Sequence, residues 1–442
     1  MTGAQTVTGA QTVTGAEAAA SAKLLTGATI VTVDAKDRVL ANHDLRIEGA
    51  RIAAIGPSGT IGKPGDAIID CASALLCPGF VNTHTHAATA MFRGLADDLP
   101  ASFWPPSYRV PGQERFSKAD YLVSLKAACG EYLLNGVTTI ADRLGGMIDF
   151  VDVIEQSGMR AILGESIAGL EHQADWSNTE ALIERIGVSP ERRVSAGIAP
   201  HALDSCPDAL LRECARRAER LGARVFIHVA QSKLEVAAVR SRGHSGALAC
   251  LVAAGLTGPH VVAAHCIYLA ESEIEAWTRH AISIAHCPSS NLKIEARTLA
   301  IHRLHGKVAI GIGTDWTATA NTNDMMAETR LAALTGKSLA GDPEKLTTRE
   351  MMRMLTIDGA RVLGLDAITG SLEPGKRADI VALSLDRLEM TPLHDPVSNI
   401  IWSANPRSVR DVFADGEALV RNGKLARAGE TALARAHRRL EG

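Results

Sequence analysis

The middle of the chain alternates short apolar runs with longer segments of helical periodicity. The apolar runs read PGFVNTH, GVTTIADR, MRAILGES, RRVSAGIAPH, ARVFIHVA, HVVAAHC, AISIAHCP and VAIGIGTD. Between them lie segments such as SKADYLVSLKAACGEYLLN and DALLRECARRAERLG, in which apolar residues recur at i, i+3 and i+4. Eight buried strands that alternate with helices are typical of a parallel (β/α)₈ barrel. We therefore predict an α/β fold with such a barrel over residues 77–370.

The two ends of the chain have a different, strand-rich pattern. IVTV, DLRIEG and RIAAIG are short β-type runs broken by turn residues, and VFADGEALV carries an Asp-Gly hairpin signal. We predict that residues 23–76 and 371–428 form one small β-sandwich domain. Residues 1–22 contain the repeat TGAQTV-TGAQTV-TGA, which is too short to build a coiled repeat, so we predict a disordered tail. Residues 429–442 are expected to form a C-terminal helix.

The composition argues against several classes of partner. Lys+Arg 46 against Asp+Glu 49 gives a net charge of −3, which provides no global attraction to nucleic acid or to an anionic membrane surface. No run approaches the roughly 18 apolar residues that a membrane span needs. The 8 cysteines are scattered without a C-x-x-C pair, and the chain begins without a signal-peptide pattern. We expect a cytoplasmic protein with reduced thiols that acts on a small molecule and binds neither nucleic acid nor membrane.

Polar residues follow nearly every apolar run, where each strand would have its carboxyl end. They are His84 and His86, Asp142 and Arg143, His201, His228, His265, His286 and Asp315. In a barrel these ends meet at one mouth, where active sites are built. One histidine after a strand is usually a packed core residue, but histidines after five runs and an aspartate after the last indicate a metal site. The H-x-H spacing of His84 and His86 places both imidazoles on one face of a strand, and this ligand chemistry suits Zn²⁺ or another borderline divalent ion.

With these motifs the chain resembles the amidohydrolase superfamily of metal-dependent hydrolases. PGFVNTHTH, APH, HVAQSKLEV, AHC, HCPSSNLKI, GTDW and GSLEPGKRADIVAL occur in the family's order over nearly the whole chain. The pattern most resembles the branch of 5-methylthioadenosine/S-adenosylhomocysteine deaminases, guanine-type deaminases and s-triazine chlorohydrolases. The resemblance implies a distorted TIM barrel with a small β-sandwich, and a homodimer or homotetramer.

The resemblance also implies roles for the strand-end residues. One divalent metal ion, Zn²⁺ with Fe²⁺ or Mn²⁺ as alternatives, would be held by His84, His86, His228 and Asp315. No lysine follows SAGIAPH or RAILGES, so the bridging carboxylated lysine of binuclear relatives is missing and we expect a mononuclear site. Asp315 would be the general base for a metal-bound water whose pKa falls to about 7. His265 would stabilise the developing oxyanion, and His201 resembles the family histidine that contacts the substrate.

One position in the HVAQSKLEV motif departs from the family pattern. Relatives that deaminate heterocycles carry a glutamate three residues after the third metal histidine, where it protonates a ring nitrogen. This chain has Gln231 there, and an amide cannot deliver a proton. Glu235, four residues further on, is interpreted as structural. We expect Gln231 to face the substrate and predict that His201 supplies the proton instead.

The loop after the first strand departs from the pattern too. It reads ADDLPASFWPPSYRVPGQERF, and its one glutamate, Glu114, is placed differently from the glutamate that binds ribose in adenosine-type relatives. We predict that this loop covers the pocket and that Trp104 contacts the substrate. Arg143 and Trp316, which follow the second and eighth strands, are further candidate substrate contacts.

The sequence thus predicts a metal-dependent hydrolase that acts on C–N bonds of a cyclic amidine. The favoured reaction is hydrolytic deamination of a purine, a pterin or a nucleoside-like heterocycle. One alternative is hydrolytic removal of chloride, an alkylamine or an alkylthiol from an s-triazine-like ring, because such leaving groups depend less on the missing glutamate. A second alternative is an inactive homologue that only binds a small molecule.

Overall fold

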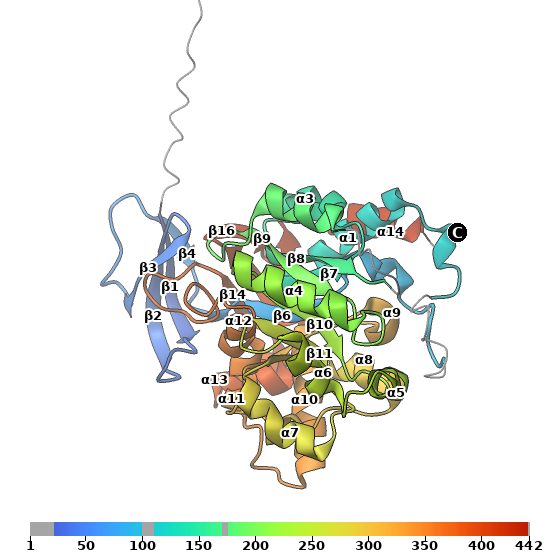
Figure 1. The fold of residues 1–442 in the computed structure, drawn as a ribbon. Helices are drawn as coiled ribbons and strands as arrows, with labels where there is room; N and C mark the ends of the chain where they lie inside the picture. Colours follow the sequence, from blue (N-terminus) through green and yellow to red (C-terminus); the bar gives the residue numbers. More distant parts are fainter. Residues whose placement is uncertain (1–21, 100–109, 170–175, 441–442) are drawn as a thin grey trace, which may run out of the picture.

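The computed structural model describes residues 22–99, 110–169 and 176–440. Its two parts are an eight-stranded barrel and a nine-stranded sheet (Figure 1). The predicted tail, apart from Ala22, and the predicted substrate contact Trp104 lie outside the described residues. Within these ranges, no helix is long and apolar enough to cross a membrane.

Eight parallel strands form the barrel in the order of the sequence. They are β6 (Phe80–Thr85), β7 (Val137–Leu144), β8 (Arg160–Ile167), β9 (Val194–Pro200), β10 (Val225–Val229), β11 (Val261–His265), β12 (Ser283–His286) and β13 (Ile310–Ile312). The strand ladder is interrupted between β13 and β6, where an isolated bridge joins Thr85 to Asp315 and the Thr83 hydroxyl donates to the Ile312 carbonyl oxygen at 2.9 Å. The predicted distorted barrel is therefore confirmed, and its irregular seam lies beside the predicted metal ligands.

Helices connect the strands and cover the outside of the barrel (Figure 1). They are α1 (Lys118–Leu134), α2 (Val151–Ser157), α3 (Ser177–Ile186), α4 (Asp208–Leu221), α5 (Lys233–Ser241), α6 (Ala247–Ala254), α7 (Glu271–Trp277), α8 (Pro288–Glu295), α9 (Thr317–Ala320), α10 (Met325–Ala340), α11 (Thr348–Leu355) and α12 (Ile357–Val362), followed by α13 (Pro396–Ser398) and α14 (Glu430–Arg438). The two segments quoted above for their helical periodicity form α1 and α4. A capping box between Ser117 and Asp120 begins α1.

The second sheet combines strands from both ends of the chain. They are β1 (Lys23–Val31), β2 (Val39–Glu48), β3 (Arg51–Pro57), β4 (Ala67–Asp70), β5 (Ala74–Pro78), β14 (Ile380–Ser384), β15 (Val409–Ala414), β16 (Glu417–Arg421) and β17 (Lys424–Leu425). The two ends meet where β5 and β14 pair antiparallel, from Pro78–Ile380 to Ala74–Ser384. This pairing joins the strand-rich segments from the two ends of the chain into one sheet.

A buried ion pair attaches the second sheet to the barrel. Arg160, the first residue of β8, is 1% exposed, and its Nε lies 3.1 Å from Asp379 Oδ2. Its Nη2 also contacts Asp415, in the turn between β15 and β16. Because Arg160 lies at the amino end of its strand, this contact leaves the opposite end of the barrel, where the strand-end histidines lie, open for a site.

Candidate metal centre

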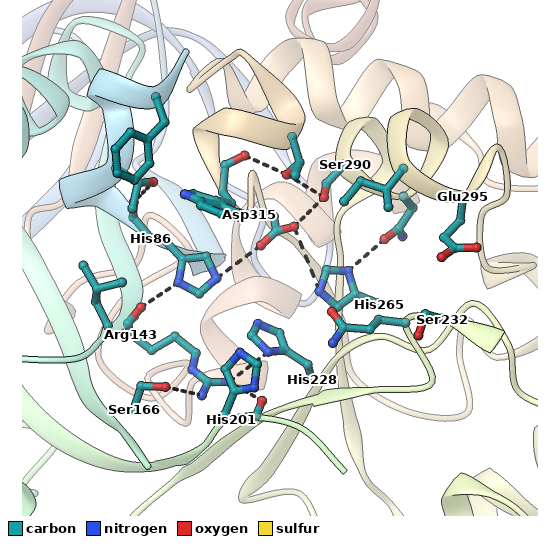
Figure 2. Close-up of a pocket in the computed structure, with 18 of the residues that line it drawn as sticks. His86, Arg143, Ser166, His201, His228, Ser232, His265, Ser290, Glu295 and Asp315 are labelled. Atoms are coloured by element: carbon teal, nitrogen blue, oxygen red, sulfur yellow. Dashed lines mark hydrogen bonds and ion pairs between the residues drawn. The ribbon is translucent and has the colours of Figure 1, made fainter. Parts of the chain in front are cut away.

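Four of the predicted site residues converge at the carboxyl ends of three strands. His84 and His86 lie at the end of β6, His228 on β10 and Asp315 after β13. Each offers one ligand atom, and the four atoms lie within 4.8 Å of one another. His84 Nε2 is 3.2 Å from both Asp315 Oδ1 and His228 Nε2, and His86 Nε2 is 3.3 Å from the same carboxylate oxygen. Figure 2 shows His86, His228 and Asp315 directed toward a common region of the pocket.

This donor set fits a divalent cation. Burial lowers the pKa of His84 to about 3. Burial and the nearby Arg143 charge hold the pKa of His228 well below its usual range. Both rings are therefore neutral near pH 7, which is the form that binds metal. Two neutral imidazole nitrogens that face each other, and the carboxylate beside them, can all coordinate one cation bound between them. A set of three imidazoles and one carboxylate suits Zn²⁺.

The seam between β6 and β13 brings together the candidate ligands that lie on or after the first and the last strand of the barrel. The Asp315 backbone N–H donates to the His84 carbonyl oxygen at 2.9 Å. Gly313 permits this approach, because a Cβ there would lie 2.9 Å from the same carbonyl oxygen. His265 and Asp315 have φ angles of 72° and 61°, a region that costs a non-glycine residue roughly 1–3 kcal/mol. Both strained residues lie at strand ends, and their side chains point into the site.

Two histidines at the site, His86 and His265, are oriented through their Nδ1 atoms. His86 Nδ1 donates to the Arg143 carbonyl oxygen at 2.7 Å, so its Nε2 carries the lone pair that a metal needs. His265 Nδ1 lies 2.8 Å from Asn291 Oδ1, and its Nε2 lies 4.0 Å from Asp315 Oδ2. His265 is therefore held beside the four-residue cluster, as the sequence comparison with the family implied.

The second carboxylate oxygen of Asp315 has a partner that sequence reasoning missed. Ser290 donates from its hydroxyl to Asp315 Oδ2. Burial alone would raise the pKa of Asp315, but His265 and the hydrogen bonds with His84 and His86 hold it well below its usual range. The HCPSSN motif was the signal that could have indicated Ser290, because Asn291 in the same motif contacts His265.

Arg143 lines the pocket, but most of its donors are used within the protein. It is 2% exposed, and Nη1 donates to the His201 carbonyl oxygen at 2.9 Å and lies 3.4 Å from His228 Nδ1. Nη2 donates to the Ser166 hydroxyl at 3.1 Å and to the Ala199 carbonyl oxygen at 3.2 Å. The guanidinium thus joins the ends of β8, β9 and β10, and a contact between Arg143 and the substrate stays a prediction.

Gln231 lies in the pocket wall on a loop that a buried glutamate shapes. Glu235 is 0% exposed. Its carboxylate accepts from the backbone N–H groups of Ala230 at 3.0 Å and Gln231 at 2.7 Å. Glu235 therefore fixes the backbone from which Gln231 enters the pocket, which is consistent with the structural interpretation of Glu235.

The pocket combines the predicted residues with others that the sequence did not indicate. His201, Gln231, Arg143 and Trp316 all line it, and apolar side chains such as Phe92, Ile267 and Ile294 form its walls. The residues missed from the sequence include Gln113, Tyr121 and Glu295. These come from a loop, from α1 and from α8, whose approach to the mouth depends on tertiary packing rather than on a strand-end pattern.

Comparison with known proteins agrees with this geometry. The 5-methylthioadenosine/S-adenosylhomocysteine deaminase of Pelotomaculum thermopropionicum is 34% identical over 402 residues, which are 90% of this chain and 92% of that protein. An adenosine deaminase from Xanthomonas campestris, crystallised with bound zinc, has a TM-score of 0.86 at 29% identity and covers 95% of this chain and 97% of its own. Atrazine chlorohydrolase from Arthrobacter aurescens, in complex with zinc, has a TM-score of 0.87 at 23% identity over 95% of this chain and 100% of its own. The last similarity shows a shared fold.

The Amidohydrolase family itself matches residues 75–419. This span contains the whole barrel and all four converging residues. The resemblance inferred from the motifs is thus confirmed, and the chain belongs to the amidohydrolase family.

Proposed function

We propose that this chain is a hydrolytic deaminase of an adenosine-like nucleoside and that one Zn²⁺ ion is held by His84, His86, His228 and Asp315. The observation that carries the proposal is the convergence of these four side chains at the carboxyl end of the barrel, where His86, His228 and Asp315 line a pocket. The nucleoside class is supported by the deaminase from P. thermopropionicum, and Zn²⁺ by the zinc bound in the adenosine deaminase from X. campestris.

The residues around the four ligands support hydrolysis. A bound divalent ion supplies Lewis acidity and a water that ionises near neutral pH. Asp315 is ionised and receives the proton of the attacking water, while the Ser290 hydroxyl fixes its Oδ2. His265, held by Asn291 through Nδ1, has its Nε2 4.0 Å from Asp315 Oδ2 and is placed beside the attacking water and the developing oxyanion.

Gln231 is the residue that favours a second candidate reaction. Release of ammonia from an aminopurine is helped by a proton on a ring nitrogen, and the Gln231 amide donates hydrogen bonds but no proton. Chloride, alkylthiol or alkylamine groups on an s-triazine ring depend less on such a proton. Their hydrolytic removal is therefore the alternative reaction for the same pocket.

A substrate screen distinguishes these reactions. We expect zinc-loaded protein to release ammonia from 5-methylthioadenosine or adenosine, with the ultraviolet change of a deaminated purine. The same screen should include aminopyrimidines, pterins and s-triazines. A ring change without ammonia would select the alternative reaction. Tight binding without turnover would instead identify an inactive homologue that only binds a small molecule.

Gln231→Glu tests the missing proton donor directly. If the reaction is a deamination, we expect this variant to raise kcat on the nucleoside by at least about tenfold, since a positioned acid can contribute roughly 10²–10⁴-fold. Gln231→Ala, which also removes the amide but adds no acid, is the matched control and should lower kcat. A Gln231→Glu variant that loses activity as Gln231→Ala does would indicate that Gln231 orients the ring by hydrogen bonds alone.

A further inference from the structure

A second carboxylate lies in the pocket wall, away from the metal ligands. Glu295 is the last residue of α8 (Pro288–Glu295), and it lines the same pocket as Asp315. The start of α8 is fixed at the metal centre, because Ser290 contacts Asp315 and Asn291 contacts His265. Four residues of helix rise by about 6 Å, so α8 extends from the metal centre along the wall and ends at Glu295. Figure 2 shows Glu295 apart from the cluster, on the far side of His265 from His86.

Glu295 keeps one carboxylate oxygen available to a ligand. The Tyr268 hydroxyl donates to Oε2 at 2.6 Å. Burial, together with this hydrogen bond, raises the pKa of Tyr268 to about 12, so the phenol remains a donor. Two cations lie two residues from Glu295 along the chain, and both have other partners. Arg297 stacks on the Tyr268 ring at 5.1 Å and donates to the Ile267 carbonyl oxygen at 2.7 Å, and Lys293 pairs with Asp97 at 2.5 Å. Within the described part of the chain, Glu295 forms no ion pair and Tyr268 is its one hydrogen-bond donor.

The chemistry of the pocket changes between its two ends. Among the described lining residues, Asp315 and Glu295 are the two acids, and Asp315 is engaged by the histidines and Ser290. Ile267, Ile294 and Trp316 form apolar wall, which suits the faces of a flat heterocycle. A carboxylate beyond such a wall accepts hydrogen bonds from hydroxyl groups and repels phosphate or carboxylate groups. Glu114, the glutamate of the loop after β6, is exposed and does not line the pocket.

We propose that Glu295 binds the ribose hydroxyls of a nucleoside substrate and so selects nucleosides over free bases and over nucleotides phosphorylated on the sugar. The inference rests on the proposed function for the identity of the substrate ring. The contact with the sugar is argued separately, from the position and the hydrogen bond of the Glu295 carboxylate. Hydrogen bonds from the 2′- and 3′-hydroxyls to this carboxylate would replace those that the hydroxyls make with water. Glu295 is thus a specificity residue and takes no part in the transfer of the water proton.

The test compares adenosine with 2′,3′-dideoxyadenosine, which lacks both hydroxyls. In zinc-loaded wild-type protein, we expect kcat/KM to be about 10- to 100-fold higher for adenosine, the factor that corresponds to a hydrogen bond to a charged group. Glu295→Gln should remove most of this preference by raising KM for adenosine, with kcat/KM for the dideoxy compound nearly unchanged. Glu184→Gln, on the outer helix α3, is the matched control and should behave as wild type.

Calorimetric titration of both nucleosides into the same zinc-loaded proteins separates this inference from the proposed reaction. Adenosine that binds without being deaminated, and whose affinity falls in Glu295→Gln, would support the sugar contact although the proposed reaction had failed. An equal loss for both nucleosides would overturn the inference, because it indicates a general change in the pocket. Unchanged affinity for adenosine, or no binding of either nucleoside to wild type, would overturn it too. Glu295→Ala provides a second variant if Glu295→Gln is unstable on thermal denaturation.

Discussion

Asp315→Asn is expected to lower kcat by at least about 10³-fold and to leave purified protein with less than one metal ion per chain. Loss of a positioned acid or base alone costs roughly 10²–10⁴-fold. The substitution also removes the negative charge of the ligand set, because the Asp315 carboxylate faces both His84 and His86. His84→Ala should have a similar effect by removing a nitrogen ligand. Steady-state kinetics and elemental analysis of the same preparations measure both consequences.

Ser290→Ala is the matched control for this prediction. It removes the hydroxyl that donates to Asp315 Oδ2 but keeps the carboxylate and its charge. We expect it to retain about one metal ion per chain and to lose much less activity than Asp315→Asn. Wild-type protein that holds two ions per chain, or none after purification with zinc, would refute the mononuclear site. Near-normal turnover by Asp315→Asn would exclude Asp315 as the base.

The barrel could be predicted because its signal is local. Strands that are buried on both faces are apolar along their length, and the helices between them carry apolar residues at regular spacing. The candidate site residues followed from the same pattern, because parallel strands in a barrel bring their carboxyl ends to one mouth. The resemblance to the family then selected four of them as candidate metal ligands. Residues as far apart as His84 and Asp315 could thus be placed together without knowledge of any contact between them.

The parts that the sequence did not indicate depend on orientation in space. Helix α8 carries two adjacent serines, of which Ser290 contacts Asp315, whereas the Ser289 backbone N–H donates to Glu328. Sequence alone did not tell which face of so short a helix turns toward the pocket, and Glu295 was missed for the same reason. Arg143 was expected to face the substrate because it follows a strand. Its side chain does line the pocket, but the sequence did not indicate that the guanidinium also donates to carbonyl oxygens on β9 and beyond, whose positions only the folded barrel defines.

His201→Ala is expected to lower kcat on a confirmed deamination substrate by roughly 10²–10³-fold, the range for a lost hydrogen bond to charge that develops in the transition state. His201 follows β9 and lines the pocket. Ser205 Oγ lies 2.7 Å from its Nδ1 and fixes the ring. Burial and the adjacent Arg143 charge lower the pKa of His201 to about 3, so the ring is neutral at pH 7. A ring that is neutral at pH 7 does not hold the extra proton that our prediction from the sequence requires. We therefore expect His201 to act on the substrate ring as a hydrogen-bonding partner, and its loss to leave the metal content unchanged.

The pH dependence and two further variants make this prediction specific to the ring of His201. A histidine with a pKa of about 3 stays neutral at higher pH. His201→Ala should therefore lower kcat by the same factor at every pH between about 5 and 8, and should not change the shape of the pH profile. Ser205→Ala, which removes only the orienting contact, should cost less than His201→Ala. His201→Gln should recover part of the loss, because an amide can also form hydrogen bonds. A His201→Ala enzyme with nearly wild-type kcat would show that ring activation comes from another residue, and Gln231 would then be the first to test.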